Sequence, residues 1–266
     1  MPNLQAGRRI RMSSINHWRC YRLGKEYPDV KKRAKDTLGK YFEDPKVMKF
    51  NDVEKTVRFK TELLIPAKRT SRSQIMLLFS NPHPHSIQQG MFLSPSSNKR
   101  KSSIWKVMRD AGWFPSCTED YGSERLREMF LRVEYPGPFE FLFCCYYAFP
   151  TTMPEQIRGI FGDEFFDEVI KEKARKEFAR RTEDTHVAVI VTFNKSIFNL
   201  ITNSKIPVYI ERLKGGNVVS DWCRNGEKKI PVFLTYPTGW RYHKKSEKLR
   251  VKNLKLVEDD ILKYVK

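Results

Sequence analysis

Residues 75–80 read IMLLFS, an almost unbroken apolar run of the length of one β-strand. Such a run is typical of a strand that is buried on both faces of a parallel sheet. Three similar runs follow, FEFLFCCYY at 139–147, VAVIVT at 187–192 and PVFLT at 231–235. Together the four runs predict a central sheet with other elements covering both of its faces.

Helical patterns alternate with these runs. They lie at 103–111, 163–181, 195–201 and 254–265, and a further one precedes the first strand at 30–42. Strands that alternate with helices predict an α/β fold, here a three-layer sandwich around a mainly parallel four-stranded sheet. We therefore expect an α/β domain at residues 74–266 and a basic N-terminal extension at residues 1–73. In such a sheet, ligands bind at the carboxyl ends of the strands.

The charge of the chain predicts a polyanionic partner. The 266 residues include 50 Lys and Arg against 31 Asp and Glu, a formal net charge of +19. Residues 1–73 hold 19 of these cations against 8 acidic residues, and residues 241–266 hold 9 against 4. Nucleic acid is the partner that such an excess favours, and a basic surface that is merely solvated is the alternative.

Other classes of protein lack support in the sequence. No apolar run reaches the roughly 18 residues that a membrane span needs, and the first residues do not resemble a signal peptide. The five cysteines include no CxxC pair, which argues against a zinc ribbon or a four-cysteine cluster. We expect buried thiols at Cys144 and Cys145, a reducing compartment (cytoplasm, nucleoid or nucleus), a monomer, and neither metal nor cofactor.

A short segment with polar residues, proline or glycine follows each of the four predicted strands. Asn81-Pro82 follows the first strand, and Gly90, Asn98 and then Trp105-Lys106 come after it in the same loop and helix. The other strands precede the segments FPT at 149–151, NK at 194–195 and YPTGW at 236–240. Their order and spacing, over about residues 74–242, resemble the motifs of the uracil-DNA glycosylase superfamily. The mismatch-specific uracil/thymine branch is the closest.

The resemblance implies a DNA glycosylase of base excision repair. Such an enzyme extrudes a deaminated or mismatched base from DNA and hydrolyses its N-glycosidic bond. By position in the motifs, Asn81 would position water, and Tyr236 would donate a hydrogen bond to the base or a phosphate. The base pocket would comprise Phe79, Ser80, Pro82, His83, Phe92 and Asn194. Contacts to DNA would come from Lys99, Arg100, Lys101, Trp240, Arg241, His243 and Lys244.

Several of these residues also allow a structural interpretation. Asn81 could support a turn, Phe92 could belong to the core, and Lys99, Arg100 and Lys101 could form a solvated loop. Trp240 could wedge into the base stack or anchor its own loop. His83 and His85 could contact substrate or phosphate, or form an ordinary loop, and a metal site is the weakest alternative because no carboxylate or thiol lies nearby in sequence.

Departures from the motifs keep a second function open. Phe79 and His83 stand where that branch has glycine, Tyr236 stands in place of His or Asn, and Leu93 occupies the position of the stacking aromatic. The second hypothesis is a catalytically silent protein of the same fold that binds nucleic acid as an accessory or structural factor. A nuclease is a third class, but no clear carboxylate pair or histidine-metal pattern supports it.

Overall fold

The computed structural model describes residues 16–94, 103–114, 122–238 and 244–265. The eight strands in these residues form one mixed sheet in the order β1-β3-β5-β4-β6-β8-β7, with β2 paired to β3. The strands are β1 (Asn16–Arg22), β2 (Met48–Asn51), β3 (Thr56–Leu64), β4 (Ser73–Phe79), β5 (Phe139–Cys145), β6 (Val187–Thr192), β7 (Val219–Asn225) and β8 (Lys228–Leu234). The protein is therefore of the α/β class, as predicted.

The four strands that the apolar runs predict are β5, β4, β6 and β8. They are neighbours in the sheet and all parallel. The prediction of four strands in all is wrong, because β1, β2, β3 and β7 extend the sheet with antiparallel pairs. Each of these outer strands has charged residues at exposed or half-exposed positions, so their sequences lack the long apolar runs of the central strands.

Helices connect the strands. They are α1 (Tyr27–Leu38), α2 (Pro84–Gln89), α3 (Ser103–Asp110), α4 (Ser123–Arg132), α5 (Glu155–Phe161), α6 (Asp163–Phe165), α7 (Lys171–Asp184), α8 (Lys195–Thr202), α9 (Tyr209–Lys214) and α10 (Lys244–Ile261). Short 3-10 turns occur at η1 (Gly24–Glu26) and η2 (Gly39–Tyr41), and the π-helical turn η4 (Phe166–Ile170) joins α6 to α7. None of the described helices combines the length and apolar character that crossing a bilayer requires.

Alternate residues of β4 build two cores on opposite faces of the sheet. Ile75 and Leu77 belong to a core that includes residues of α3, α4 and α10. Met76 and Leu78 belong to a second core that includes residues of α7, α8 and α9. This alternation follows from the period of two in a strand, and it explains why β4 is apolar throughout.

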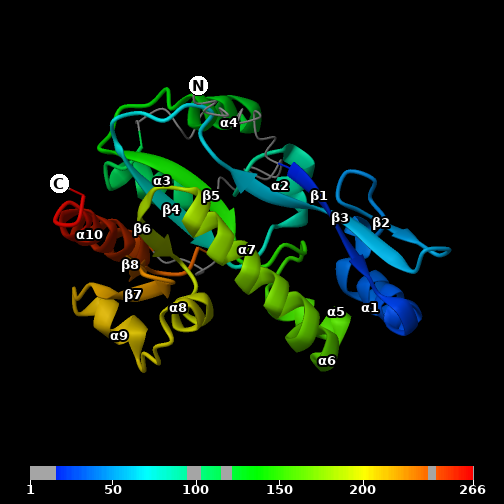
Figure 1. Cartoon of the computed structure of the whole chain (residues 1–266). Helices are drawn as coiled ribbons and strands as arrows, with labels where there is room; N and C mark the ends of the chain where they lie inside the picture. The colour runs from blue at the N-terminus through cyan, green and yellow to red at the C-terminus, as the bar shows by residue number, and fades with distance from the viewer. Residues whose placement is uncertain (1–15, 95–102, 115–121, 239–243, 266) are drawn as a thin grey trace, which may run out of the picture.

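A third core lies under the N-terminal strands. It joins residues of β1, β2 and β3 to α1 and α5, and Figure 1 shows these elements at one end of the sheet, with α10 at the other. Strand β3 also pairs with β5, where Leu63 is opposite Cys144. Residues 16–64 therefore continue the same sheet, while the division of the chain into two parts at residue 73 stays a prediction.

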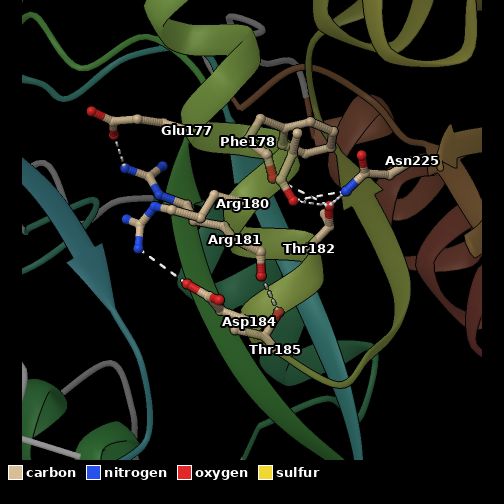
Figure 2. Close-up of polar contacts among 9 residues, drawn as sticks. Glu177, Phe178, Arg180, Arg181, Thr182, Asp184, Thr185 and Asn225 are labelled. Atoms are coloured by element: carbon tan, nitrogen blue, oxygen red, sulfur yellow. Dashed lines mark hydrogen bonds and ion pairs between the residues drawn. The ribbon is translucent and has the colours of Figure 1, made fainter.

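Polar contacts fix the end of α7 to strand β7. The side-chain nitrogen of Asn225 donates to the carbonyl oxygen of Ala179 and to the hydroxyl of Thr182, each at 2.7 Å, and Figure 2 shows Asn225 pointing at this last turn of the helix. Lys228 donates to the carbonyl oxygen of Thr182 at 2.7 Å. The last four carbonyls of a helix have no partner within it, and the Lys228 contact satisfies that of Thr182.

Candidate functional site

A cavity of about 490 Å³ lies at the carboxyl ends of the four parallel strands. Each of the loops after β4, β5, β6 and β8 contributes to its wall, and so does strand β3. Its size is in the range of small-molecule sites. The lining residues are Glu62, Phe79, Ser80, Asn81, His83, Ser86, Phe92, Leu93, Cys145, Thr151, Thr152, Met153, Pro154, Glu155, Phe193, Asn194, Pro237 and Thr238.

Asn81 is held in one orientation at this cavity. Its Nδ2 donates to the carbonyl oxygen of Thr151 at 2.8 Å, to the Thr151 hydroxyl at 2.9 Å and to the carbonyl oxygen of Pro82 at 3.1 Å. Its Oδ1 accepts from the Ser80 hydroxyl at 2.9 Å. A carbonyl oxygen has two lone pairs, so Oδ1 can accept a second hydrogen bond, for example from a water molecule in the cavity.

Three phenylalanines form an apolar part of the wall. The rings of Phe79 and Phe193 lie 5.4 Å apart and within 4° of parallel, and the ring of Phe92 lies 5.7 Å from that of Phe79. All three line the cavity and also belong to the core that includes residues of α3, α4 and α10. The two interpretations of Phe92 are therefore compatible, because a core residue at the rim of a cavity presents one side to a ligand.

Glu62 is a buried carboxyl group in the same cavity. It comes from β3, its side chain is 2% exposed, and the backbone N–H of His83 donates to it. Its Oε1 atom has no hydrogen-bond partner among the described residues. Burial raises the pKa of Glu62 to about 8, opposed by the His83 hydrogen bond. Near neutral pH the group is mostly a neutral acid, which can both donate and accept a hydrogen bond.

Glu62 is not among the site residues that the sequence motifs predict. It lies within the expected N-terminal extension, where charged residues are frequent. The available signal was its position in TELLI, at residues 61–65, as the one charged residue beside an apolar run. Acidic residues are rarely buried without a partner, so a carboxyl group in this setting is a candidate for function.

His83 begins helix α2 and also lines the cavity. Its Nδ1 accepts from the backbone N–H of His85 at 3.2 Å, which caps the helix. Burial lowers the pKa of His83, and the nearby His85 lowers it further, so the ring is neutral at neutral pH. With Nδ1 as acceptor, Nε2 carries the proton. Within the described part of the chain, no group of three or more His, Cys, Asp or Glu is arranged to hold a metal ion.

Two other predicted residues support the loops of the site. Asn194 lines the cavity and caps α8, because its side-chain oxygen accepts from the backbone N–H of Ile197 at 3.1 Å. Pro82 is buried, and its carbonyl oxygen accepts from Asn81 and, at 3.1 Å, from the backbone N–H of Thr151. Cys144 and Cys145 are both buried, as predicted, and Cys145 reaches the cavity wall.

Tyr236, which was predicted to donate a hydrogen bond to the base or a phosphate, does not line the cavity. Its side chain is 2% exposed, and it belongs to the core on the α7 and α8 face rather than to the cavity wall. The reason is the period of two in extended chain: Leu234 and Tyr236 lie in the same core, while Phe233 lies in the opposite one. Burial raises the pKa of Tyr236, so its hydroxyl stays protonated.

The predicted DNA-contact residues cannot be placed. Lys99, Arg100, Lys101, Trp240, Arg241 and His243 lie outside the described residues. Lys244 is the first residue of α10, and its side chain is not described. Their contacts with DNA stay predictions.

Comparison with known proteins identifies no family. No protein-family model matches the chain, and no curated protein matches it significantly in sequence.

Proposed function

We propose that this protein is a DNA glycosylase that extrudes a uracil-like base, deaminated or mismatched, and hydrolyses its N-glycosidic bond. The observation that carries the proposal is the fixed amide of Asn81, whose oxygen lies at a cavity with an aromatic wall. A polar group that orients water beside an apolar surface for a planar base is what this reaction needs. The resemblance of the loop motifs to the uracil-DNA glycosylase superfamily and the excess of cations give further support.

The proposed reaction uses residues on the cavity wall. The base packs against Phe79 and Phe92, and the oxygen of Asn81 accepts a hydrogen bond from the attacking water. As the bond between the sugar carbon and the base nitrogen breaks, its electron pair goes to the base. The water oxygen bonds to the sugar carbon, and the proton that it loses passes through solvent to the departing base, which leaves as the neutral free base. Protonated Glu62 donates a hydrogen bond to the base, where negative charge develops.

One observation favours a second candidate, a silent protein of this fold that binds nucleic acid. Tyr236 occupies the place of the closing motif's His or Asn, and it lies in the core rather than at the cavity. The cavity thus lacks a donor from that position. In the glycosylase proposal, Glu62 supplies a donor from a different strand.

A base-release assay separates the two candidates. Labelled single strands and duplexes carrying uracil, hypoxanthine, a thymine mismatch or an oxidised base are incubated with the protein, and abasic sites are then cleaved with alkali. The glycosylase proposal expects cleavage at one or more of these bases, and its loss in Asn81→Ala. Binding to DNA with no release from any substrate would contradict it and favour the silent protein.

A further inference from the structure

One face of the N-terminal strands is basic and carries an exposed tryptophan. Facing residues of an antiparallel pair point to the same side of a sheet, and Trp18 is opposite Lys60, while Arg58 is opposite both Cys20 and Lys49. The opposite side of these strands packs into the core under α1 and α5. We call the uncovered side the β1–β3 face, which consists of Trp18, Cys20 and Arg22 from β1, Lys49 from β2, and Arg58 and Lys60 from β3.

The cations of the β1–β3 face are available to a ligand. Trp18 is 41% exposed, and its ring lies 5.6 Å from the guanidinium carbon of Arg58 and 5.3 Å from the ammonium nitrogen of Lys60. Within the described ranges, Arg22, Lys49, Arg58 and Lys60 form no ion pair with a carboxylate. An exposed aromatic ring beside cations that no described carboxylate neutralises is an arrangement that can bind a base by stacking and its neighbouring phosphates by charge.

The β1–β3 face leads to the cavity along strand β3. Side chains two apart in a strand lie on the same side, so Arg58, Lys60 and Glu62 form one row. Glu62 is part of the cavity wall. With a rise of about 3.3 Å per residue, the backbones of Lys60 and Arg58 are about 7 and 13 Å from that of Glu62 along the strand. Figure 1 shows β3 extending from β1 and β2 into the main sheet.

We propose that the β1–β3 face binds single-stranded DNA, the part of the strand that flanks the nucleotide entering the cavity. Phosphates contact the four cations, and one base stacks on Trp18. A single strand is the occupant because the bases of a duplex hide their faces in the stack and cannot use an exposed indole. The flanking position rests on the proposed glycosylase function, whereas binding of the strand itself does not.

The test measures binding of a fluorescein-labelled undamaged oligo(dT) strand to the full chain by fluorescence anisotropy over a range of salt. Trp18→Leu removes the aromatic ring and is expected to weaken binding about 5- to 100-fold, and Trp18→Phe to retain most of it. The double variant Arg58→Ala/Lys60→Ala removes two phosphate contacts. It should reduce the slope of log affinity against log salt by about 1.4.

The matched control is Lys32→Ala/Lys35→Ala. These lysines are exposed on α1, the helix that packs on the other side of the same strands, and their removal changes the net charge equally. The control should leave both affinity and salt slope near those of the wild type. Unchanged melting temperatures of all variants would show that the fold is intact.

Three results would overturn the proposal. One is an equal loss of affinity in the α1 control, which would indicate attraction by net charge alone. Another is an unchanged affinity in Trp18→Leu. The third is stronger binding of a duplex, an RNA strand of matched length or polyglutamate through the same residues, which would assign the face to another partner. The oligo(dT) strand carries no damaged base, so this binding measurement does not depend on catalysis. Absence of base release in the cleavage assay described above would contradict the proposed function and leave this binding result unchanged.

Discussion

The side-chain nitrogen of Asn81 lies 2.8 Å from the carbonyl oxygen of Thr151, which joins two loops that are 70 residues apart in sequence. Asn81 follows β4 and Thr151 follows β5, and these strands are parallel neighbours. The contact fixes the orientation of the Asn81 amide, because Nδ2 donates to protein acceptors. Its nitrogen is fully used by Thr151 and Pro82, and its oxygen remains the atom that can act on a ligand.

Replacement of Asn81 by alanine should abolish most base release without preventing DNA binding. Loss of one preorganised polar group at a reaction centre costs about 10²–10³ in rate. Single-turnover cleavage, with an anisotropy titration of the same DNA, measures the two properties separately. Full activity in a folded Asn81→Ala protein would show that Asn81 does not position water.

Replacement of Thr151 by valine should reduce the rate to a smaller extent. The hydroxyl that accepts from Asn81 at 2.9 Å is lost, whereas the backbone carbonyl at 2.8 Å remains. The same hydroxyl also donates to the carbonyl oxygen of Met153 at 2.8 Å, but only the bond from Asn81 acts on the amide, and one neutral hydrogen bond corresponds to roughly a 3- to 10-fold change. Thr151→Ser keeps the hydroxyl and serves as the control. A loss in Thr151→Val as large as that in Asn81→Ala would contradict this account.

Replacement of Glu62 by glutamine should stabilise the protein increasingly as the pH rises from about 5 to 8. The pKa of Glu62 is about 8 in the folded protein against an ordinary value of 4.5. Between these values the unfolded chain releases a proton that the folded protein keeps, so the free energy of unfolding of the wild type falls with rising pH. Glutamine cannot ionise, and it retains an oxygen that can accept from His83.

The size of this effect is on the order of 5 kcal/mol at most, the equivalent of the whole pKa shift. Urea unfolding of the wild type and Glu62→Gln at pH 5, 6.5 and 8 measures it. The two curves should diverge with pH and level off above pH 8. A difference in stability that stays constant over this range would show that Glu62 ionises normally in the folded protein.

Physical differences between strands explain how much of the fold could be predicted. The central strands are buried on both faces, so IMLLFS and VAVIVT identify β4 and β6 directly. Strand β3 has charged residues on its exposed positions and only becomes apolar where it enters the main sheet, so its sequence resembles a surface segment. The four parallel strands were predictable for this reason, and the outer four were not.

Only the part of the candidate site that lies in loops directly after strands was predictable from the sequence. Asn81, His83 and Asn194 directly follow strands or begin helices, and chain order places such loops at one edge of a parallel sheet. Glu62 reaches the same cavity through the pairing of β3 with β5, a contact between distant residues that no local pattern shows. Tyr236 lies two residues beyond Leu234, the last residue of β8, and its side chain lies in the same core as that of Leu234. Its place in the motif therefore did not predict its position in the structure.

Replacement of Arg181 by alanine should destabilise the protein by about 1–3 kcal/mol, because a buried carbonyl loses a charged donor. Its side chain is 5% exposed, and its guanidinium donates to the Cys144 thiol at 2.8 Å, the Cys145 carbonyl at 2.9 Å and Glu177 at 2.7 Å. Removal of the Arg181 side chain leaves the Cys144 thiol, the Cys145 carbonyl and Glu177 without this donor, and it leaves a cavity where the side chain lay. Its neighbour Arg180, drawn in Figure 2, pairs with Asp184 on the surface, and Arg180→Ala should cost no more than about 1 kcal/mol. Equal midpoints of urea unfolding for the two variants would contradict this difference.

Replacement of Tyr236 tests whether the hydroxyl acts in catalysis or the ring acts in the core. The buried position predicts that Tyr236→Ala loses about 3–5 kcal/mol of stability, as for other large core side chains. Tyr236→Phe keeps the ring, so its rate of base release should stay within a few-fold of the wild type. Melting temperature and single-turnover cleavage on the same preparations separate the two roles. A 10²-fold slower release in Tyr236→Phe at an unchanged melting temperature would instead place the hydroxyl at the substrate, and the core position would then have to open when DNA binds.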